Sequence, residues 1–360
     1  MDPLLAPTGL QIAWFALIAL LFGVYFVLEG FDFGVQMNVG TLARDDHERH
    51  TLLSTIHPVW DGNQVWIITG AAAIFAAFPE WYATLFSGFY PVLLLLLFSL
   101  IVRVVAFTYR DARPGDAWRR AWDGIHVATG FLPPFLWGIV LGDVVAGVEI
   151  DQNRWVVTSA AGLLQPFALL TGVVLVLLFW LHGSHYLTLK LQGELRERAR
   201  RRALLLMLPA LVGGAALLLW YQLAYSHQAW TWAPLLVAAL ALVGTLLAQR
   251  GRREGLSLVG TGVAILAAAA TLFGGLFPYV MPSTGLEGTG LTVAGSSSTP
   301  HTLTIMLIAT CILVPVILVY QSWAYWVFRH RLNEDGSTRV TVKPLAARLA
   351  EGHRRAFEAE

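Results

Sequence analysis

Charged residues are scarce in this 360-residue sequence. Asp, Glu, Lys and Arg together make up 13% of the residues, against about a quarter in soluble globular domains, and hydrophobic residues make up 56%. So little polar surface cannot cover so much apolar material in water, which indicates a chain that resides in lipid. The formal net charge is only +1, so we expect no nucleic-acid partner.

Cysteine is nearly absent as well. The one cysteine, Cys311, lies inside an apolar run, which excludes an intramolecular disulfide and a cysteine metal site, and we expect its thiol to serve packing. The sequence also lacks a nucleotide-binding loop, a catalytic triad and a zinc-ligand pattern. These absences predict a chain with no catalytic residue and no metal ligand of its own.

Long apolar runs occur along almost the whole sequence. A bilayer core about 30 Å thick is crossed by roughly 20 apolar residues of helix. Unpaired backbone groups are too costly in lipid, and the alternation of a β-barrel is missing, so we expect an all-α integral membrane protein with about nine transmembrane helices. Two four-helix bundles plus a ninth helix would be a natural packing. The runs cover residues 10–33, 56–78, 81–102, 125–145, 156–181, 203–224, 232–248, 256–280 and 302–328.

The basic residues predict the orientation. Of the 24 Lys and Arg residues, 22 fall in every second connection or in the C-terminal tail, and only Arg154 lies in a connection on the other side. Because short cytoplasmic loops carry the excess of Lys and Arg, we place the N-terminus outside and the C-terminus in the cytoplasm. We divide the chain into helices one to four (1–150), helices five to eight (151–285), an outer loop with helix nine (286–330) and a cytoplasmic tail (331–360).

Two acidic residues stand inside the first predicted helix. A charged side chain at the bilayer centre costs about 2.5–3.5 kcal/mol on insertion scales, so each one calls for a reason. Glu29 and Asp32 are three residues apart and share a helix face, while Gly30 and Gly34 allow a neighbouring backbone to approach closely. Because this helix runs inward, we place both carboxylates near its cytoplasmic end.

A second polar stretch begins the next predicted helix. His57 and Asp61 are four residues apart, so an imidazole and a carboxylate on one helix face could share a proton. Trp60 stands between them, and Asn63 and Gln64 extend the polar stretch into the span. We interpret Asp61 as a functional residue.

Arg103, Asp123 and His126 fall at the same depth, at the inner ends of the third and fourth predicted helices. Acidic and histidine groups can relay protons once burial brings their pKa values near physiological pH. For Glu29 and Asp123, plain solvation among the headgroups stays open as an alternative. We hypothesise a route for proton uptake from the cytoplasm. Its predicted members are Glu29, Asp32, His57, Asp61, Asp123 and His126, with Trp60, Asn63, Gln64 and Arg103 as structural support.

His182 and His185 end the fifth predicted helix and stand three residues apart, which invites a haem or metal interpretation. Gly183, Ser184 and Lys190 around them are typical of a helix end near water, whereas axial haem ligands are buried among helices. We therefore expect a solvated pair that binds no haem.

Seven short segments carry a resemblance to a known family. The strongest is WDGNQVW within the second segment, because chance agreement over seven such residues is improbable. The sequence resembles subunit II of the cytochrome bd type quinol oxidases of bacteria over nearly its whole length, most densely in helices one to four. The segments are EGFDFG at 29–34, HPVWDGNQVW at 57–66, SGFY at 87–90, FLPP at 131–134, QPF at 165–167, FPYVMPS at 277–283 and LVPVI at 313–317.

The resemblance implies a heterodimer in the bacterial cytoplasmic (inner) membrane. Subunit I would carry the b haems and haem d, oxidise quinol and reduce oxygen to water. Subunit II would bind no haem directly, support subunit I and supply a hydrophilic route for cytoplasmic protons. The resemblance leaves open a structural quinone, which some relatives hold in this subunit, and a small single-helix subunit as a further partner.

The match to the family motif is residue by residue. Trp60, Asp61 and Asp32 match it directly, and Glu29 stands where some relatives have Asp. Gln36 stands where relatives commonly have Gly, and we expect this departure not to touch the acidic cluster.

Two other functions are alternatives to this one. A proton-coupled secondary transporter would place its binding site near the bilayer midplane at broken helices, but the ionisable residues gather toward one side. A haem cytochrome would use His57, His126 or His182 as ligands, and the absorption spectrum of the purified chain tests it.

Overall fold

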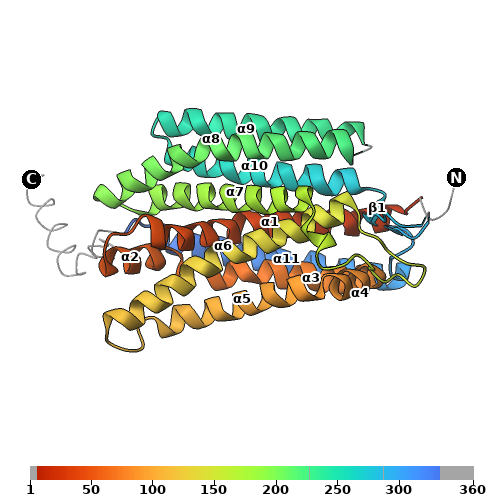
Figure 1. The fold of residues 1–360 in the computed structure, drawn as a ribbon, viewed down its shortest axis with the longest axis horizontal. Helices are drawn as coiled ribbons and strands as arrows, with labels where there is room; N and C mark the ends of the chain where they lie inside the picture. Colours follow the sequence, from red (N-terminus) through yellow and green to blue (C-terminus); the bar gives the residue numbers. More distant parts are fainter. Residues whose placement is uncertain (1–5, 227, 287, 333–360) are drawn as a thin grey trace, which may run out of the picture.

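The fold is an elongated bundle of helices that run roughly along one axis (Figure 1). The structure is a computed structural model, and it describes residues 6–226, 228–286 and 288–332. Apart from short 3-10 turns, the other regular structure within these residues is one antiparallel pair of strands, β1 (Tyr279–Met281) and β2 (Leu291–Thr292). The predicted tail lies almost wholly outside the described residues. The expected all-helical class is confirmed.

The helices have the following bounds. They are α1 (Gly9–Thr41), α2 (Asp46–Ile56), α3 (Trp60–Ala77), α4 (Pro79–Gly88), α5 (Tyr90–Tyr109), α6 (Asp116–Ala146), α7 (Pro166–Lys190), α8 (Gly193–Ala224), α9 (Trp232–Arg250), α10 (Glu254–Leu276) and α11 (Pro300–Val327).

Eight of the described helices are long and apolar enough to cross a membrane, namely α1 and α5 to α11, where α9 is taken together with the preceding turn. The helix α3 lies alongside them but is not among the eight. It has 18 residues, and Asp61, Asn63 and Gln64 near its start lower its hydropathy. The count of nine spans therefore stays a prediction.

Three of the differences between the predicted spans and the helices concern the start or division of a helix or the end of α7. The second run was expected to begin at residue 56, but α2 ends there and α3 begins only at Trp60, because Pro58 has no N–H for a helical hydrogen bond. The third run is divided into α4 and α5 at Phe89. The fifth helix, α7, begins at Pro166, a residue suited to a first helical turn, and extends to Lys190 rather than to residue 181.

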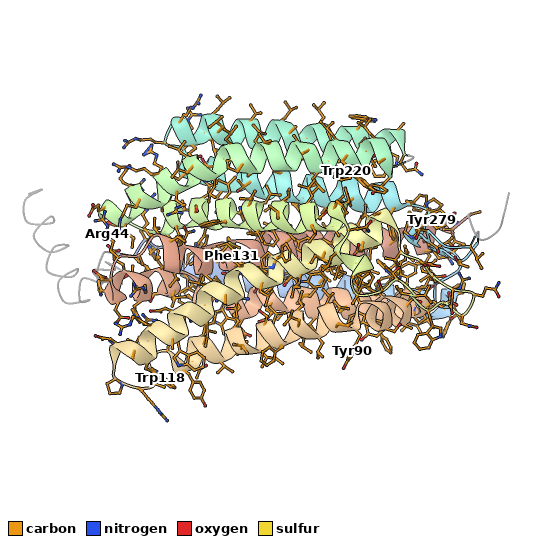
Figure 2. All side chains as sticks on the ribbon, viewed as in Figure 1. Arg44, Tyr90, Trp118, Phe131, Trp220 and Tyr279 are labelled. Carbon is orange, nitrogen blue, oxygen red and sulfur yellow. The ribbon has the colours of Figure 1, made fainter. Side chains whose placement is uncertain are left out.

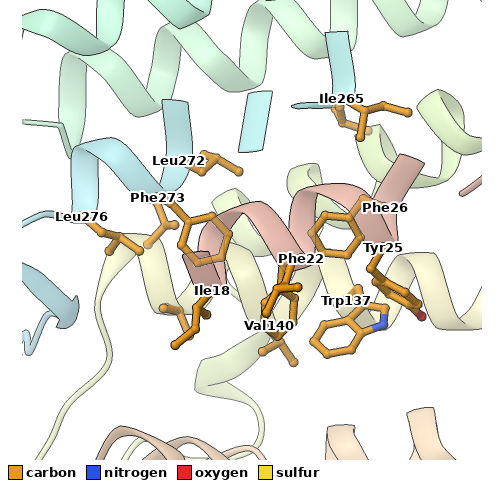
Figure 3. Close-up of a cluster of buried hydrophobic side chains, with 14 of the residues drawn as sticks. Ile18, Phe22, Tyr25, Phe26, Trp137, Val140, Ile265, Leu272, Phe273 and Leu276 are labelled. Atoms are coloured by element: carbon orange, nitrogen blue, oxygen red, sulfur yellow. The ribbon is translucent and has the colours of Figure 1, made fainter. Parts of the chain in front are cut away.

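The helix α1 lies at the centre of the bundle and packs against α3, α6, α7 and α10. Aromatic side chains fill the core on one side of it, and the rings of Phe22 and Trp137 meet edge to face at 5.8 Å (Figure 3). On another side, a Cβ atom on Gly34 would lie 2.8 Å from the Cα of Gly183 on α7. The expected close approach of a neighbouring backbone at Gly34 is confirmed.

The helix α11 is the least embedded of the candidate spans. Only 6% of its most apolar 18-residue stretch is buried within the protein, where it contacts α1 and α3. Specific bonds hold it at both ends. The indole of Trp14 donates to the carbonyl of Leu303 at 3.0 Å, and the ammonium of Lys190 donates to the carbonyls of Phe328 and His330. Directional bonds therefore position this helix more than apolar burial does.

Candidate functional site

One end of the bundle carries most of the described basic residues, and we call it the basic end. Here α1, α5, α7, α9 and α11 end while α6, α8 and α10 begin; Arg44 and Trp118 mark it in Figure 2, and Tyr279 marks the opposite end. The predicted site residues lie in the half of the bundle toward the basic end. This placement agrees with the common depth expected from the sequence.

Glu29 of α1 and Arg103 of α5 form a buried ion pair, and both side chains are fully shielded from solvent. The guanidinium carbon of Arg103 also lies 4.7 Å from the ring centre of Phe33, a cation–π contact. The second carboxylate oxygen of Glu29 and two nitrogens of Arg103 have no hydrogen-bond partner within the described residues. Glu29 is therefore not a headgroup residue, and the solvation alternative for it is wrong.

Asp32 is fully buried and belongs to a chain of hydrogen bonds that reaches α11. Its Oδ2 accepts from the amide of Asn63 on α3 at 2.7 Å. The Oδ1 of Asn63 in turn accepts from Nε2 of Gln321 at 2.9 Å and from the hydroxyl of Tyr325 at 2.6 Å. Trp66 completes the chain by donating to Gln321 at 2.6 Å. Asn63 thus supports Asp32 as expected.

Gln321 and Tyr325 were missed at the level of sequence. The signal was present, because Gln321 is an isolated amide in a long apolar run and Tyr325 stands one helical turn later on the same face.

His126 of α6 is fully buried, and its Nδ1 lies 2.9 Å from Nε2 of Gln36 on α1. Gln36 thus contacts a histidine of the predicted route, a contact that the sequence did not indicate. The two helices approach closely here because Gly130 has no side chain: a Cβ atom there would lie 3.0 Å from the Cβ of Gln36. Oε1 of Gln36 has no hydrogen-bond partner within the described part of the chain, and the His126 ring also interacts with the backbone of Ala106.

Asp123 lies one turn nearer the basic end than His126 and is 6% exposed. Its Oδ1 accepts from Nε of Arg110 at 2.7 Å, and its Oδ2 lies 3.9 Å from Arg49. Arg110 also pairs with Asp46 at 2.6 Å. Burial alone would lower the pKa of Arg110, but its hydrogen bond to Asp123 and the nearby acidic charges raise it above the ordinary value. Asp123 is therefore held in an ion-pair network rather than freely solvated.

His57 and Asp61 are both exposed in this chain, and among the described residues no hydrogen bond joins them. The structure thus does not show the shared proton expected from their spacing. Trp60 is half-buried and stacks on Phe107, with ring centres 4.9 Å apart. Gln64 is half-buried and lines a cavity of about 420 Å³ between α3, α5 and α6.

Phe107 joins these groups and was not singled out by the sequence. Its ring contacts four site residues on four different segments. The ring centre of Phe107 lies 4.9 Å from that of Trp60, 6.2 Å from that of His57 and 4.7 Å from that of His126. It lies 5.8 Å from the guanidinium carbon of Arg103.

The expectation that His182 and His185 are solvated is wrong, since each is only 1% exposed. The reason is the shifted boundary of α7, which continues to Lys190 and encloses both rings. Both ring nitrogens of His182 have protein partners, the hydroxyl of Thr261 at 2.6 Å and the carbonyl of Val27 at 3.1 Å. His182 therefore links α7 to α10 and α1.

Comparisons with known proteins bear on this arrangement. The sequence profile of the family described as cytochrome bd terminal oxidase subunit II matches residues 10–328. The chain belongs to the cytochrome bd terminal oxidase subunit II family. Among its relatives, the cytochrome bd ubiquinol oxidase subunit 2 of Bacillus subtilis (strain 168) is 36% identical over 326 residues, 89% of this chain and 96% of the relative. The cytochrome bd-I ubiquinol oxidase subunit 2 of Escherichia coli (strain K12) is 33% identical over 371 residues, 92% and 97% of the two chains.

The fold agrees with this subunit II assignment. The structure of the bd oxidase from Geobacillus thermodenitrificans superposes with a TM-score of 0.72 at 18% identity, covering 89% of this chain and 99% of that chain. The resemblance expected from the sequence motifs is confirmed. The chain is a multi-pass membrane protein and a component of an oxidoreductase complex.

Proposed function

We propose that this chain is subunit II of a respiratory terminal oxidase that transfers electrons from quinol to oxygen and forms water. It pairs with a haem-bearing subunit I in the bacterial inner membrane. Support comes from the family match over residues 10–328 and from relatives whose names specify ubiquinol oxidase subunit 2. The chain is inactive alone, because the b haems and haem d are held by subunit I.

The chain itself supplies a route for protons that enter from the cytoplasm. The observation that carries this proposal is the pair of fully buried carboxylates, Glu29 and Asp32, each with one oxygen that lacks a partner within the described residues. A buried polar atom of this kind is costly unless water or another chain reaches it. His126 and Asp123 continue the series toward the basic end, which the positive-inside rule assigns to the cytoplasm.

Asp61 has a different place in this route. It lies at the exposed start of α3, on a helix that also exposes Ile68 and Phe75, with exposed fractions of 67% and 60%. Exposed apolar surface of this extent suits lipid or a partner subunit. We propose that subunit I covers α3 and that Asp61 passes protons across the contact.

A structural quinone is a further part of the proposal. The cavity of about 420 Å³ is lined almost entirely by apolar side chains from α1, α3, α4, α5, α6 and α10, which suits an isoprenoid or ring system. Gln64 and the buried indole nitrogen of Trp81, which has no hydrogen-bond partner within the described residues, provide polar atoms for a carbonyl oxygen. Because the haems are held by subunit I, a quinone bound in this chain would have a structural role.

The test uses the complex of this chain with its subunit I in liposomes. Asp32→Asn keeps the shape and the bond to Asn63 but removes the titratable carboxyl, so oxygen consumption with quinol should fall at least tenfold while haem content stays constant. Asp116→Asn is the matched control, because Asp116 is exposed in the first turn of α6 at the basic end. Equal rates in D32N and wild type, with normal haem content, would contradict the route.

A further inference from the structure

A shallow groove of about 370 Å³ lies on the surface between α6 and α7, and apolar and aromatic side chains line it. The two helices touch through Gly138 and Gly172, and α6 then diverges from α7 toward the basic end (Figure 1). The groove occupies the angle between them. Phe131, labelled in Figure 2, lies in it, and its ring meets that of Trp180 edge to face at 5.3 Å. A surface of this kind suits an alkyl chain.

The groove ends at Trp180 on its basic side, and Arg202 of α8 lies there. The guanidinium carbon of Arg202 is 5.5 Å from the ring centre of Trp180, a cation–π contact. The indole is itself fixed, because its Nε1 donates to Oδ1 of Asn38 at 3.2 Å. One guanidinium nitrogen of Arg202 donates to the carbonyl of Thr41 at 2.7 Å. These contacts hold the cation at the end of the groove.

The charge of Arg202 is not neutralised within the described residues. No carboxylate among them lies within ion-pair distance of Arg202, whereas Arg196 and Arg198 on the same helix pair with Glu254 and Glu48. A guanidinium presents paired N–H donors that match the oxygens of a phosphate group. The groove therefore joins an apolar channel to an uncompensated cation that complements an anion.

The depth of this cation is that of a lipid headgroup. The sequence of α8 changes from basic to apolar after Arg202, and its apolar run begins at Ala203. Such a boundary in a membrane helix lies where phosphate groups meet acyl chains, because a basic side chain keeps its charged end in the polar layer. Trp180 fits the same level, since tryptophan is enriched at membrane interfaces.

We infer that the groove between α6 and α7 binds an anionic phospholipid from the leaflet at the basic end. Its phosphate pairs with Arg202, and one acyl chain lies along Phe131 and Trp180. This face differs from the one assigned to subunit I, because α11 packs against α1 and α3 and lies behind α6 in Figure 1. Lipid can therefore reach the groove while subunit I covers α3. The inference does not depend on the proton route.

The test uses the purified complex with subunit I, stripped of lipid by detergent. Native mass spectrometry measures the first bound lipid as phosphatidylglycerol, or phosphatidylcholine with the same acyl chains, is added. Wild type should bind phosphatidylglycerol more tightly. Arg202→Gln keeps a donor for Thr41 but removes the charge, so it should weaken this binding about five- to tenfold, while Arg202→Lys should retain most of it. Arg201→Gln is the matched control, because Arg201 is exposed and its loss removes the same charge from α8.

A second pair of variants tests the groove without changing any charge. Ala128→Trp fills the groove and should weaken the binding of phosphatidylglycerol, whereas Leu205→Trp, at a 71% exposed position outside it, should not. Inorganic phosphate should not displace the lipid, because it has no acyl chain. Haem content and the size-exclusion profile show that each variant is assembled, and the comparison of the two lipids on wild type needs no substitution.

Four outcomes would overturn the site. They are equal affinity of wild type for the two lipids, equal losses in R201Q and R202Q, unchanged affinity in A128W, and displacement of the lipid by inorganic phosphate. The second would mean general attraction to a basic surface, and the last would mean an anion site without a lipid chain.

Discussion

Breaking the ion pair between Glu29 and Arg103 should destabilise the protein strongly. Glu29→Gln keeps the size and one hydrogen bond but leaves Arg103 as an uncompensated cation, fully buried between α1 and α5. Removing one partner of a buried pair costs about 3–5 kcal/mol, because the remaining charge has lost both water and its counter-charge. At about 1.4 kcal/mol per tenfold, this is roughly a 140- to 3,700-fold change in the folded-to-unfolded ratio.

The assay is thermal unfolding of the purified complex, followed by loss of the monodisperse species and of haem absorbance. A second variant, Glu29→Leu with Arg103→Leu, removes both charges and should recover most of the loss, because the desolvation cost of both ions disappears with them. The coupling between the two sites then follows from a double-mutant cycle. If E29Q unfolds at the same temperature as wild type, Arg103 and Glu29 do not form an ionised pair and the reasoning is refuted.

Three further predictions follow from other contacts. Gly34→Ala should abolish assembly, because its Cβ would lie 2.8 Å from the Gly183 Cα, whereas Gly124→Ala, with open space around it, should assemble normally; size-exclusion yield decides. Burial alone would raise the pKa of Glu48, but hydrogen bonds from Arg198 and from a backbone N–H lower it below the ordinary value of 4.5. The ionised Glu48 therefore contributes its full share to the free energy of unfolding above pH 4.5. This share is lost as the pH falls through the pKa of Glu48 in the folded state. Acid titration of unfolding in wild type and R198Q checks this, and identical slopes would contradict it. Asp61→Asn should slow quinol oxidation in the assembled complex, and an unchanged rate would exclude Asp61 from the route.

The sequence predicted the apolar architecture well because apolar length is a strong signal. Eight runs correspond to helices that can span a membrane. The ends of the helices were predicted less well, because some loops are apolar and some helix ends are polar but buried. Residues 156–165 are partly apolar yet form a loop, while His182 and His185 are polar yet lie inside α7.

The depth of the site was predictable, but its partners were not. Spacing places Glu29 and Asp32 on one face of a helix, but it does not indicate which of the other helices supplies Arg103 or Asn63. Pairing across helices depends on how closely backbones approach, and that is set by residues such as Gly130, which carry no chemical signal of their own. For the same reason the contact between Gln36 and His126 could not be predicted.

The hydrogen bonds of Asn63 have a mechanical consequence. Its amide nitrogen serves Asp32, and its amide oxygen serves both Gln321 and Tyr325 on α11. Rotating this amide would exchange a donor for an acceptor on both sides at once, so neither side can change independently. A displacement of the outermost helix is thereby transmitted to a carboxylate beside the central helix through one side chain.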